Sequence, residues 1–198
     1  MTPGPAKAYD RHRVLDRAMM LFWQRGYAAT SVRDLRTATG LGSRSLYDDF
    51  GNKREVFRAA LAHYRERSIL PLYEPLRHGA SPLAALHEFI DCFAAMDLAD
   101  RRLGCLVGVG MAETMRDDDP ELAAEIAALA VEMRDRIEEA LVAASGRGEL
   151  DPPVAPSELA ALLATALQGV HLAARVQPDG DLRADALAAA RGLLRVSP

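Results

Sequence analysis

Residues 30–50 combine side chains that bind nucleic acid with a pattern that would present them on one surface. Arg44, Ser45 and Tyr47 lie close together in the second half of this stretch. An arginine can donate two hydrogen bonds to a guanine edge, and hydroxyl groups bond to bases or to phosphate oxygens. These residue types at this spacing predict contacts with the major groove of double-stranded DNA and with its backbone.

The elements that must position these side chains are two short helices joined by a tight turn. Ser31 is followed three residues later by Asp34, which is the pattern of a capping box at a helix start. Gly40 is expected to end the first helix, and Ser43 is expected to cap the second. The apolar residues of both helices then share an inner face, so the polar residues face outward.

Residues 26–57, GYAATSVRDLRTATGLGSRSLYDDFGNKREVF, resemble the DNA-binding domain of the TetR family of bacterial transcriptional regulators. The shared order is a Gly-aromatic break, Thr-Ser-Val, Gly-Leu at the turn, Leu-Tyr-x-x-Phe, and a lysine that begins the fourth helix. The resemblance implies an all-α fold. A three-helix DNA-binding domain with a helix-turn-helix would cover residues 1–53, and a helical effector-binding and dimerisation domain would cover residues 54–198.

The expected DNA-binding residues come from the starts of three helices. Arg44 and Ser45 are expected to contact bases, whereas Tyr47 and Lys53 flank them and are expected to contact the backbone. The helix that Asn52 is expected to cap would also present free amides to phosphate. The full set is Thr30, Ser31, Arg33, Ser43, Arg44, Ser45, Tyr47 and Lys53.

The net charge is −4, but basic residues gather at one end of the chain. Residues 1–53 carry nine Lys or Arg against five Asp or Glu, a balance of +4, and residues 54–198 carry fifteen against twenty-three, a balance of −8. This distribution favours a basic end that binds DNA and an acidic remainder that DNA repels. Asp48 and Asp49 would cost affinity beside phosphates unless they pair with Arg44 or Lys53.

The rest of the chain predicts helices and shows no sustained β alternation. Prolines and glycine between residues 70 and 82 predict the end of the fourth helix and the crossing into a second domain. The helices expected after this crossing cover residues 81–98, 103–115, 120–145, 157–176 and 182–196.

An effector site needs an apolar cavity with a few polar contacts, and candidates cluster on these later helices. Methionine and phenylalanine at helical spacing suit either an adaptable pocket or a plain core, and both interpretations stay open. Gln168 and His171 interrupt an apolar helix as pocket anchors, dimer-interface groups or satisfied core groups. The candidate set is Phe89, Phe93, Met96, Cys105, Met111, Met115, Met133, Gln168 and His171.

Cys105 lies at an expected helix start, just after Arg101 and Arg102. A helix N-terminus and nearby arginines lower the pKa of a thiol and make it more reactive. The sequence also resembles a TetR subgroup that carries Gly-Cys at this point, some members of which sense electrophiles or oxidants. The alternative is an inert cysteine that packs as a small hydrophobic residue.

Several classes of function find no support in the sequence. The five histidines show no metal-ligand spacing, and no nucleophile motif or phosphate-binding glycine loop is present. We therefore expect no enzyme activity, cofactor or metal. Cys92 and Cys105 form no disulfide framework, and no signal peptide or membrane span is recognised, which favours a soluble cytoplasmic protein.

The resemblance further implies that the last two helices of each subunit form a homodimer and that the dimer binds a palindromic operator. The expected function is a transcriptional repressor that a small apolar or electrophilic effector releases from DNA. The alternative is a helical small-molecule-binding or catalytic protein whose helix-turn-helix is only structural.

Overall fold

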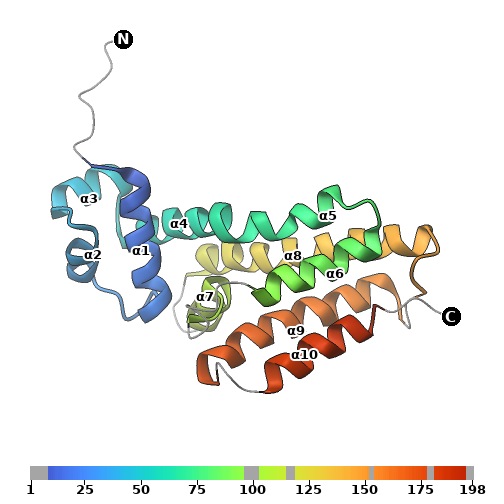
Figure 1. Cartoon of the computed structure of the whole chain (residues 1–198). Helices are drawn as coiled ribbons and strands as arrows, with labels where there is room; N and C mark the ends of the chain where they lie inside the picture. Colours follow the sequence, from blue (N-terminus) through green and yellow to red (C-terminus); the bar gives the residue numbers. More distant parts are fainter. Residues whose placement is uncertain (1–8, 96–102, 115–118, 152–153, 178–180, 195–198) are drawn as a thin grey trace, which may run out of the picture. The chain divides into compact units, whose positions relative to one another are not determined.

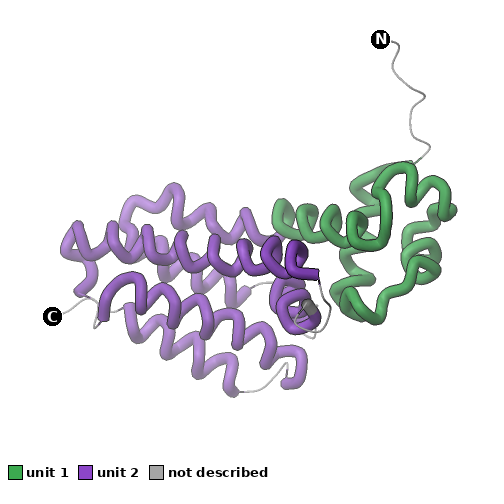
Figure 2. Tube along the Cα trace, turned by 180° about the vertical axis from the view of Figure 1, so that it is seen from behind, with its two compact units in different colours: residues 1–67 green, residues 68–198 purple. Residues whose placement is uncertain are grey.

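The computed structural model describes residues 9–95, 103–114, 119–151, 154–177 and 181–194. Every regular element within these ranges is helical, which confirms the expected all-α fold (Figure 1). The chain forms two compact units, Met1–Arg67 and Ser68–Pro198 (Figure 2).

The N-terminal unit is a small helical bundle with an aromatic core. Its helices are α1 (Arg11–Arg25), α2 (Val32–Thr39), α3 (Ser43–Phe50) and α4 (Lys53–Tyr64). Phe22 of α1 meets Phe57 of α4 edge to face at 5.0 Å between ring centroids, and Trp23 meets Tyr64 in the same way at 5.1 Å. These pairs join the first and last helices of the unit.

The domain boundary expected after residue 53 differs from the observed division after Arg67. The reason is that α4 packs along α1 and completes the core of the N-terminal unit. The contacts between these helices, such as Phe57 with Phe22, join residues far apart in the chain and are not encoded by a local sequence pattern.

The ends of the short helices depend on specific caps. The Ser31 hydroxyl accepts a hydrogen bond from the Asp34 amide, and the Asp34 carboxylate accepts one from the Ser31 amide, so the expected capping box is confirmed. Gly40 ends α2 in the left-handed conformation, with φ of 76°. The expected cap by Ser43 is wrong, because Gly42 occupies that position and provides no side-chain hydrogen bond.

The segment after α4 stays helical up to His78, so the break expected over residues 70–82 is confined to residues 79–81. It consists of the π-helical η1 (Arg65–Ile69), the 3₁₀-helical η2 (Leu70–Tyr73) and the short α5 (Glu74–His78). Pro71 and Pro75 lie at the starts of η2 and α5, where a missing backbone N–H costs little.

The C-terminal unit is a layered helical bundle. Its longer helices are α6 (Pro82–Ala95), α7 (Leu106–Thr114), α8 (Pro120–Gly146), α9 (Pro156–Val176) and α10 (Asp181–Gly192). Helix α8 packs against α6, α7 and α9, and α10 packs against α9 and α6. The helices agree with the expected ones, although α7 begins at Leu106 and α10 ends at Gly192.

Helix α9 is long and apolar enough to cross a membrane by length and composition alone, and among the described helices it is the one that passes this test. Seven of its residues are nevertheless buried inside the unit: Leu159, Ala160, Leu163, Ala164, Leu167, Val170 and Ala174. Its apolar character is therefore explained in part by its place between α8 and α10.

Replacing Ser31 with alanine should destabilise the N-terminal unit by about 1 kcal/mol, because the capping hydroxyl of α2 is lost. Trp23, the one tryptophan of the chain, is buried in this unit, so its fluorescence during urea unfolding reports the change. Thr37→Ala is the matched control, since the exposed Thr37 hydroxyl donates only to the Arg33 carbonyl of the same helix. Equal losses in both variants would contradict the capping role.

Candidate nucleic-acid interface and effector cavity

The face that α3 presents to solvent carries the side chains expected to contact DNA. Leu46 and Phe50 are buried, with 1% and 7% of their surface exposed, and they fix the inner face of the helix. Arg44 and Ser45 are exposed, and Tyr47 is 44% exposed. The three side chains that could reach a major groove are therefore accessible together.

Both acidic residues of α3 have partners within the N-terminal unit. Asp48 pairs with Arg44 at 3.6 Å, and the Tyr9 hydroxyl donates a hydrogen bond to Asp49. Arg44 is therefore the expected partner of Asp48, and Tyr9 is a partner of Asp49. The Arg44 side chain is 95% exposed and that of Asp48 70%, so the ion pair is screened by solvent and opens at little cost.

Helix α3 is held to α1 by contacts that leave its outer face unobstructed. The guanidinium of Arg11 lies 4.5 Å from the centre of the Phe50 ring. Arg17 donates a hydrogen bond of 3.3 Å to the carbonyl of Thr39 at the end of α2. Two arginines of α1 thus fix the helix-turn-helix by a cation–π contact and a backbone hydrogen bond.

Lys53 begins α4 and is half-buried. Its ammonium lies 4.3 Å from the centre of the Tyr27 ring and 3.4 Å from the Ala28 carbonyl. Asn52 caps the helix by accepting a hydrogen bond from the Glu55 amide, as expected. The cation is held at a helix N-terminus, where partial positive charge and free amides attract phosphate.

Two other expected DNA contacts have structural roles. Thr30 is 1% exposed, and its hydroxyl donates a hydrogen bond of 2.6 Å to the Gly26 carbonyl, so we leave it out of the proposed DNA-binding set. The Ser31 hydroxyl caps α2 and also donates a hydrogen bond of 2.6 Å to Asp34. Only the exposed side of Ser31 is therefore available to contact DNA. Arg33 is exposed and Ser43 is half-buried.

A polar hollow of about 450 Å³ at the helix-turn-helix turn adds two residues that the sequence interpretation did not include. Arg36 and Thr37 line it beside Arg33, together with the turn residues 40–42. Both are exposed. The signal that could have identified them is the spacing of Arg33 and Arg36, which places two guanidinium groups on one side of α2 above the turn.

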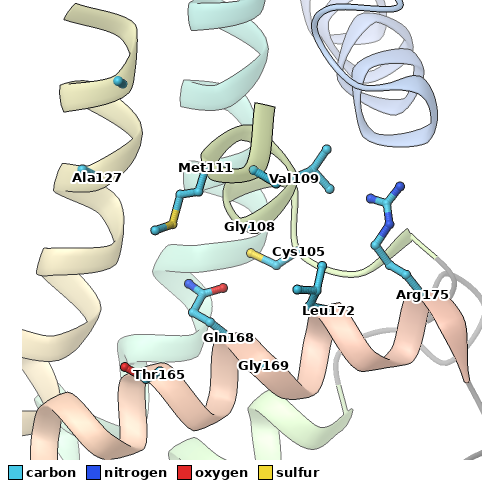
Figure 3. A pocket seen from close by; sticks show the side chains of 12 residues that line it. Cys105, Gly108, Val109, Met111, Ala127, Thr165, Gln168, Gly169, Leu172 and Arg175 are labelled. Atoms are coloured by element: carbon cyan, nitrogen blue, oxygen red, sulfur yellow. The ribbon is translucent and has the colours of Figure 1, made fainter. Parts of the chain in front are cut away.

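The C-terminal unit contains an apolar cavity of about 540 Å³ between α7, α8 and α9 (Figure 3). Its size lies within the range of small-molecule sites. Cys105, Met111 and Gln168, all expected ligand contacts, line this cavity. A smaller cavity of about 270 Å³ lies beside it, shares Met111, Thr165 and Gln168, and includes the expected Met133.

Phe89, Phe93 and His171 line neither of these two cavities. Phe89 stacks on Tyr73 at 6.1 Å, and Phe93 meets the His171 ring edge to face at 4.2 Å. Both phenylalanines are buried in the core, which favours a packing role for them. Met96 and Met115 lie outside the described residues.

His171 is held in its neutral form. Burial, and secondarily the charge of Arg183, lower its pKa to about 4. Its Nε2 atom is buried without a hydrogen-bond partner among the described residues. A neutral imidazole packed on Phe93 is a core group rather than a charged ligand anchor.

Gln168 is the polar residue in the middle of the cavity wall. Its side-chain oxygen is turned toward Gly108 of α7 and Cys105 just before that helix, and it is buried without a hydrogen-bond partner among the described residues (Figure 3). A buried acceptor left unpaired costs about 1–3 kcal/mol. Rotation of the terminal amide torsion, which is soft, would present this group to a ligand.

Cys105 lies directly before α7 and faces the cavity, where its carbonyl accepts the first helical hydrogen bond from Val109 at 3.0 Å. Arg175 of α9 donates to the Leu103 carbonyl at 2.9 Å and holds this loop on α9. Gly104 has φ of 69°, and a Cβ there would lie 2.8 Å from the His171 carbonyl, so the close approach requires glycine. Arg101 and Arg102 lie outside the described residues.

Within the described ranges, no cluster of three or more His, Cys, Asp or Glu side chains could hold a metal ion. Cys92 and Cys105 are both free thiols. The chemistry that the cavity offers is therefore apolar contact, the amide of Gln168, the Cys105 thiol, and the polar groups of Thr165 and Arg175.

Comparison with known proteins gives a family match in each of the two units. Residues 14–60 match the family of bacterial regulatory proteins, tetR family, and residues 82–190 match the tetracyclin repressor-like C-terminal domain. The HTH-type transcriptional repressor ComR of Escherichia coli is 33% identical over 177 residues, which cover 87% of this chain and 82% of ComR.

Solved structures agree with this assignment. A cysteine mutant of the TetR family regulator CifR, complexed with 26-bp operator DNA, is 30% identical, has a TM-score of 0.80, and aligns over 98% of this chain and 100% of its own. The reduced form of Escherichia coli NemR, 18% identical with a TM-score of 0.81 over 94% of this chain and 97% of its own, shares the fold. The chain belongs to the TetR family of bacterial transcriptional regulators, and it is a DNA-binding regulator rather than an enzyme.

Proposed function

We propose that the protein is a homodimeric repressor that binds a palindromic operator and is released when a small apolar or electrophilic effector occupies the C-terminal cavity. The observation that supports DNA binding is the accessible face of α3, where Arg44 forms a solvent-exposed pair with Asp48. A guanine edge can replace that carboxylate at little cost. The similarity to ComR, a repressor, and to CifR, which binds a 26-bp operator, supports the same function.

The proposed assignment of side chains to bases or to the DNA backbone follows from how firmly each side chain is held. Arg44 and Ser45 are exposed and unobstructed, so they are proposed to contact bases. Lys53 is fixed by Tyr27 and Ala28 at the start of α4, so it is proposed to contact one phosphate. Arg33, Arg36 and the free amides of the turn are proposed to hold the neighbouring backbone.

The proposed homodimer rests on the outer face of α9. Leu162, Leu172 and Val176 are 53%, 56% and 83% exposed, and Thr165 and Gly169 lie exposed between them. The five residues follow one another at intervals of three or four, which places them on one side of the helix. A two-fold pairing of this uncharged stripe would bury it and would place two α3 helices in successive major grooves.

The proposed effector is an apolar molecule with one hydrogen-bond donor. The cavity walls are apolar apart from Thr165, Gln168, Arg175 and the Cys105 thiol, and the Gln168 oxygen is the acceptor that lacks a partner. An electrophilic effector would instead form a bond to the Cys105 sulfur. The proposed compartment is the bacterial cytoplasm, which contains the operator and keeps free thiols reduced.

Arg44→Ala should weaken operator binding by about 1–3 kcal/mol and relax the sequence preference, because a base contact is lost. Lys53→Ala should weaken binding to all sequences alike and reduce the salt dependence by about one phosphate contact. Both are measured by titration of a selected operator and of unrelated DNA at several salt concentrations.

Arg77→Ala is the matched control for these variants, since Arg77 forms a comparable exposed pair with Glu74 on α5 of the C-terminal unit. It should bind DNA as the parent does. Unchanged affinity and preference in Arg44→Ala would show that α3 does not read bases through this arginine.

Sedimentation at micromolar concentration should give twice the chain mass of 21.5 kDa, because the exposed α9 stripe is uncharged and contains Leu162, Leu172 and Val176. Operator binding should show one dimer per palindrome. A monomer that binds a full palindrome tightly would be incompatible with the proposed assembly.

Treatment with an alkylating quinone should lower operator affinity if the Cys105 thiol adds across the quinone, with its sulfur on a ring carbon and its proton on the quinone. The attached ring would then occupy the cavity. The response should disappear in Cys105→Ser and persist in Cys92→Ser, the control that removes the other free thiol. The same DNA titration detects both. An identical response in parent and Cys105→Ser would exclude thiol sensing and leave reversible ligand binding as the signal.

A further inference from the structure

We infer that the effector is an elongated amphipathic carboxylate. Its carboxylate binds Arg175, a hydroxyl group on its chain donates to Gln168, and the chain continues along α9 into the second cavity. The inference rests on the proposed function, from which it takes the effector site in the C-terminal unit. It adds the charge, the length and the orientation of the ligand.

The first observation is an arginine without a counter-ion at one end of the larger cavity. Arg175 lines this cavity and is half-buried (Figure 3). Its guanidinium donates a hydrogen bond of 2.9 Å to the Leu103 carbonyl, and no carboxylate pairs with it among the described residues. A guanidinium has five N–H donors, so further donors remain for a ligand. A positive charge beside an apolar surface is best compensated by a ligand that brings an anion.

The other charged residue of the two cavities already has a partner. Arg134 lines the second cavity, and its Nε atom donates a hydrogen bond of 3.0 Å to Asp135. No acidic side chain is among the described residues that line either cavity, so a cationic ligand would find no counter-ion there. The anionic end of the ligand therefore belongs at Arg175, and its apolar end points toward Arg134.

The second observation is that the two cavities follow one another along the same pair of helices. On α9, the lining residues extend from Arg175 in the first cavity to Ala161 in the second, and Gln168 lines both. On the antiparallel α8 the order is reversed, with Ala123 in the first cavity and Ala130 in the second (Figure 1). The part of α9 between Ala161 and Arg175 is about 21 Å long at about 1.5 Å per residue. A ligand that fills both cavities must therefore be elongated.

The third observation is the position of the unpaired acceptor between these ends. Gln168 lies two helical turns before Arg175 on the same side of α9, a separation of about 10 Å. Its buried side-chain oxygen has no hydrogen-bond partner among the described residues. A hydroxyl group in the middle of the chain would donate to this oxygen while the carboxylate binds the guanidinium. An unbranched carboxylic acid with a hydroxyl group near its tenth carbon has this arrangement.

The test compares two probes in the full chain by isothermal titration calorimetry. One is octadecanoate with a hydroxyl group on its tenth carbon, and the other is its methyl ester, which has the same chain without the charge. The parent should bind the acid at least about tenfold more tightly than the ester, because a hydrogen bond to a charged group is the stronger one. Arg175→Gln should make the two affinities similar, and Arg175→Lys should retain the preference. Loss of the bond to Leu103 alone would weaken both probes equally, so the ratio of affinities reports the charge.

Two further variants serve as control and as a marker of the binding place. Arg136→Gln removes the same charge from α8, where Arg136 pairs with Glu139 and lines neither cavity, and it should keep the preference of the parent. A Cβ at Gly108 would lie 3.6 Å from the Gln168 side-chain oxygen, so Gly108→Leu places a side chain in the larger cavity. It should weaken binding of both the acid and the ester.

The length of the site is tested with a shorter probe. Decanoate with a hydroxyl group on its tenth carbon has the same carboxylate and donor but no chain beyond the donor. Ala130 is half-buried and lines the second cavity but not the first, so Ala130→Phe fills the second cavity. This variant should bind the octadecanoate probe more weakly than the parent does and bind the decanoate probe equally well.

The outcomes separate this ligand class from the proposed function. Equal affinity of the parent for acid and ester, or a preference that persists in Arg175→Gln, would overturn the carboxylate site and leave the cavity available to a neutral effector. Equal effects of Ala130→Phe on the long and short probes would overturn the extension into the second cavity. Failure of the parent to bind either long probe would overturn the ligand class, whereas unchanged binding by Gly108→Leu would overturn the cavity itself as the ligand site.

Discussion

Helix α9 carries apolar side chains on nearly every side, and the need to bury them determines how the C-terminal unit packs. Its inner side packs against α8 and α10 through leucines such as Leu163 and Leu167. Its C-terminal end holds the loop before α7 through Arg175. Its remaining side is uncharged and exposed. One helix therefore contributes to the core, to the cavity wall and to the proposed partner surface, so a change to one of these affects the others.

The cavity exists because α7 is short and carries small residues where it faces α9. Gly108 places no side chain beside Gln168, and Gly110 lets the helix approach Ile126, whose Cδ1 lies 3.0 Å from where a Cβ would be. Close packing is thus achieved on the α8 side of α7 and is absent on the α9 side. Protein interiors normally fill such space, so an apolar gap with one unpaired amide oxygen is a feature typical of a ligand site.

Local interactions made much of the N-terminal unit predictable from its sequence. The capping box of Ser31 and Asp34 and the left-handed Gly40 involve residues only a few positions apart, and the structure contains both. The boundary of the unit depends instead on the contacts of Phe22 with Phe57 and of Trp23 with Tyr64, which join residues far apart in the chain. No local pattern encodes such a pairing.

The candidate effector site was predictable only in part, for a related reason. Helical spacing shows that Phe89 and Phe93 lie on an apolar face, but the same spacing serves a core and a pocket equally well. The structure fills the space in front of these rings with Tyr73 and His171. The structure leaves a cavity beside Cys105 and Met111. Gly108, which also lines this cavity, has no side chain to fill it.

The rigidity of the N-terminal unit limits how an effector can act. The outer residues of α3 are displayed by a helix whose inner face is buried and whose C-terminal end is held by Arg11 on Phe50 and by the bond between Tyr9 and Asp49. In the proposed dimer, a ligand bound in the C-terminal unit would act on the separation of the two α3 helices, which must lie about 34 Å apart to occupy successive major grooves. A ligand shifts such an equilibrium only by the difference in its affinity for the two arrangements. Because α9 lines the cavity and also carries the proposed partner surface, a ligand in the cavity would lie against the helix on which the proposed pairing depends.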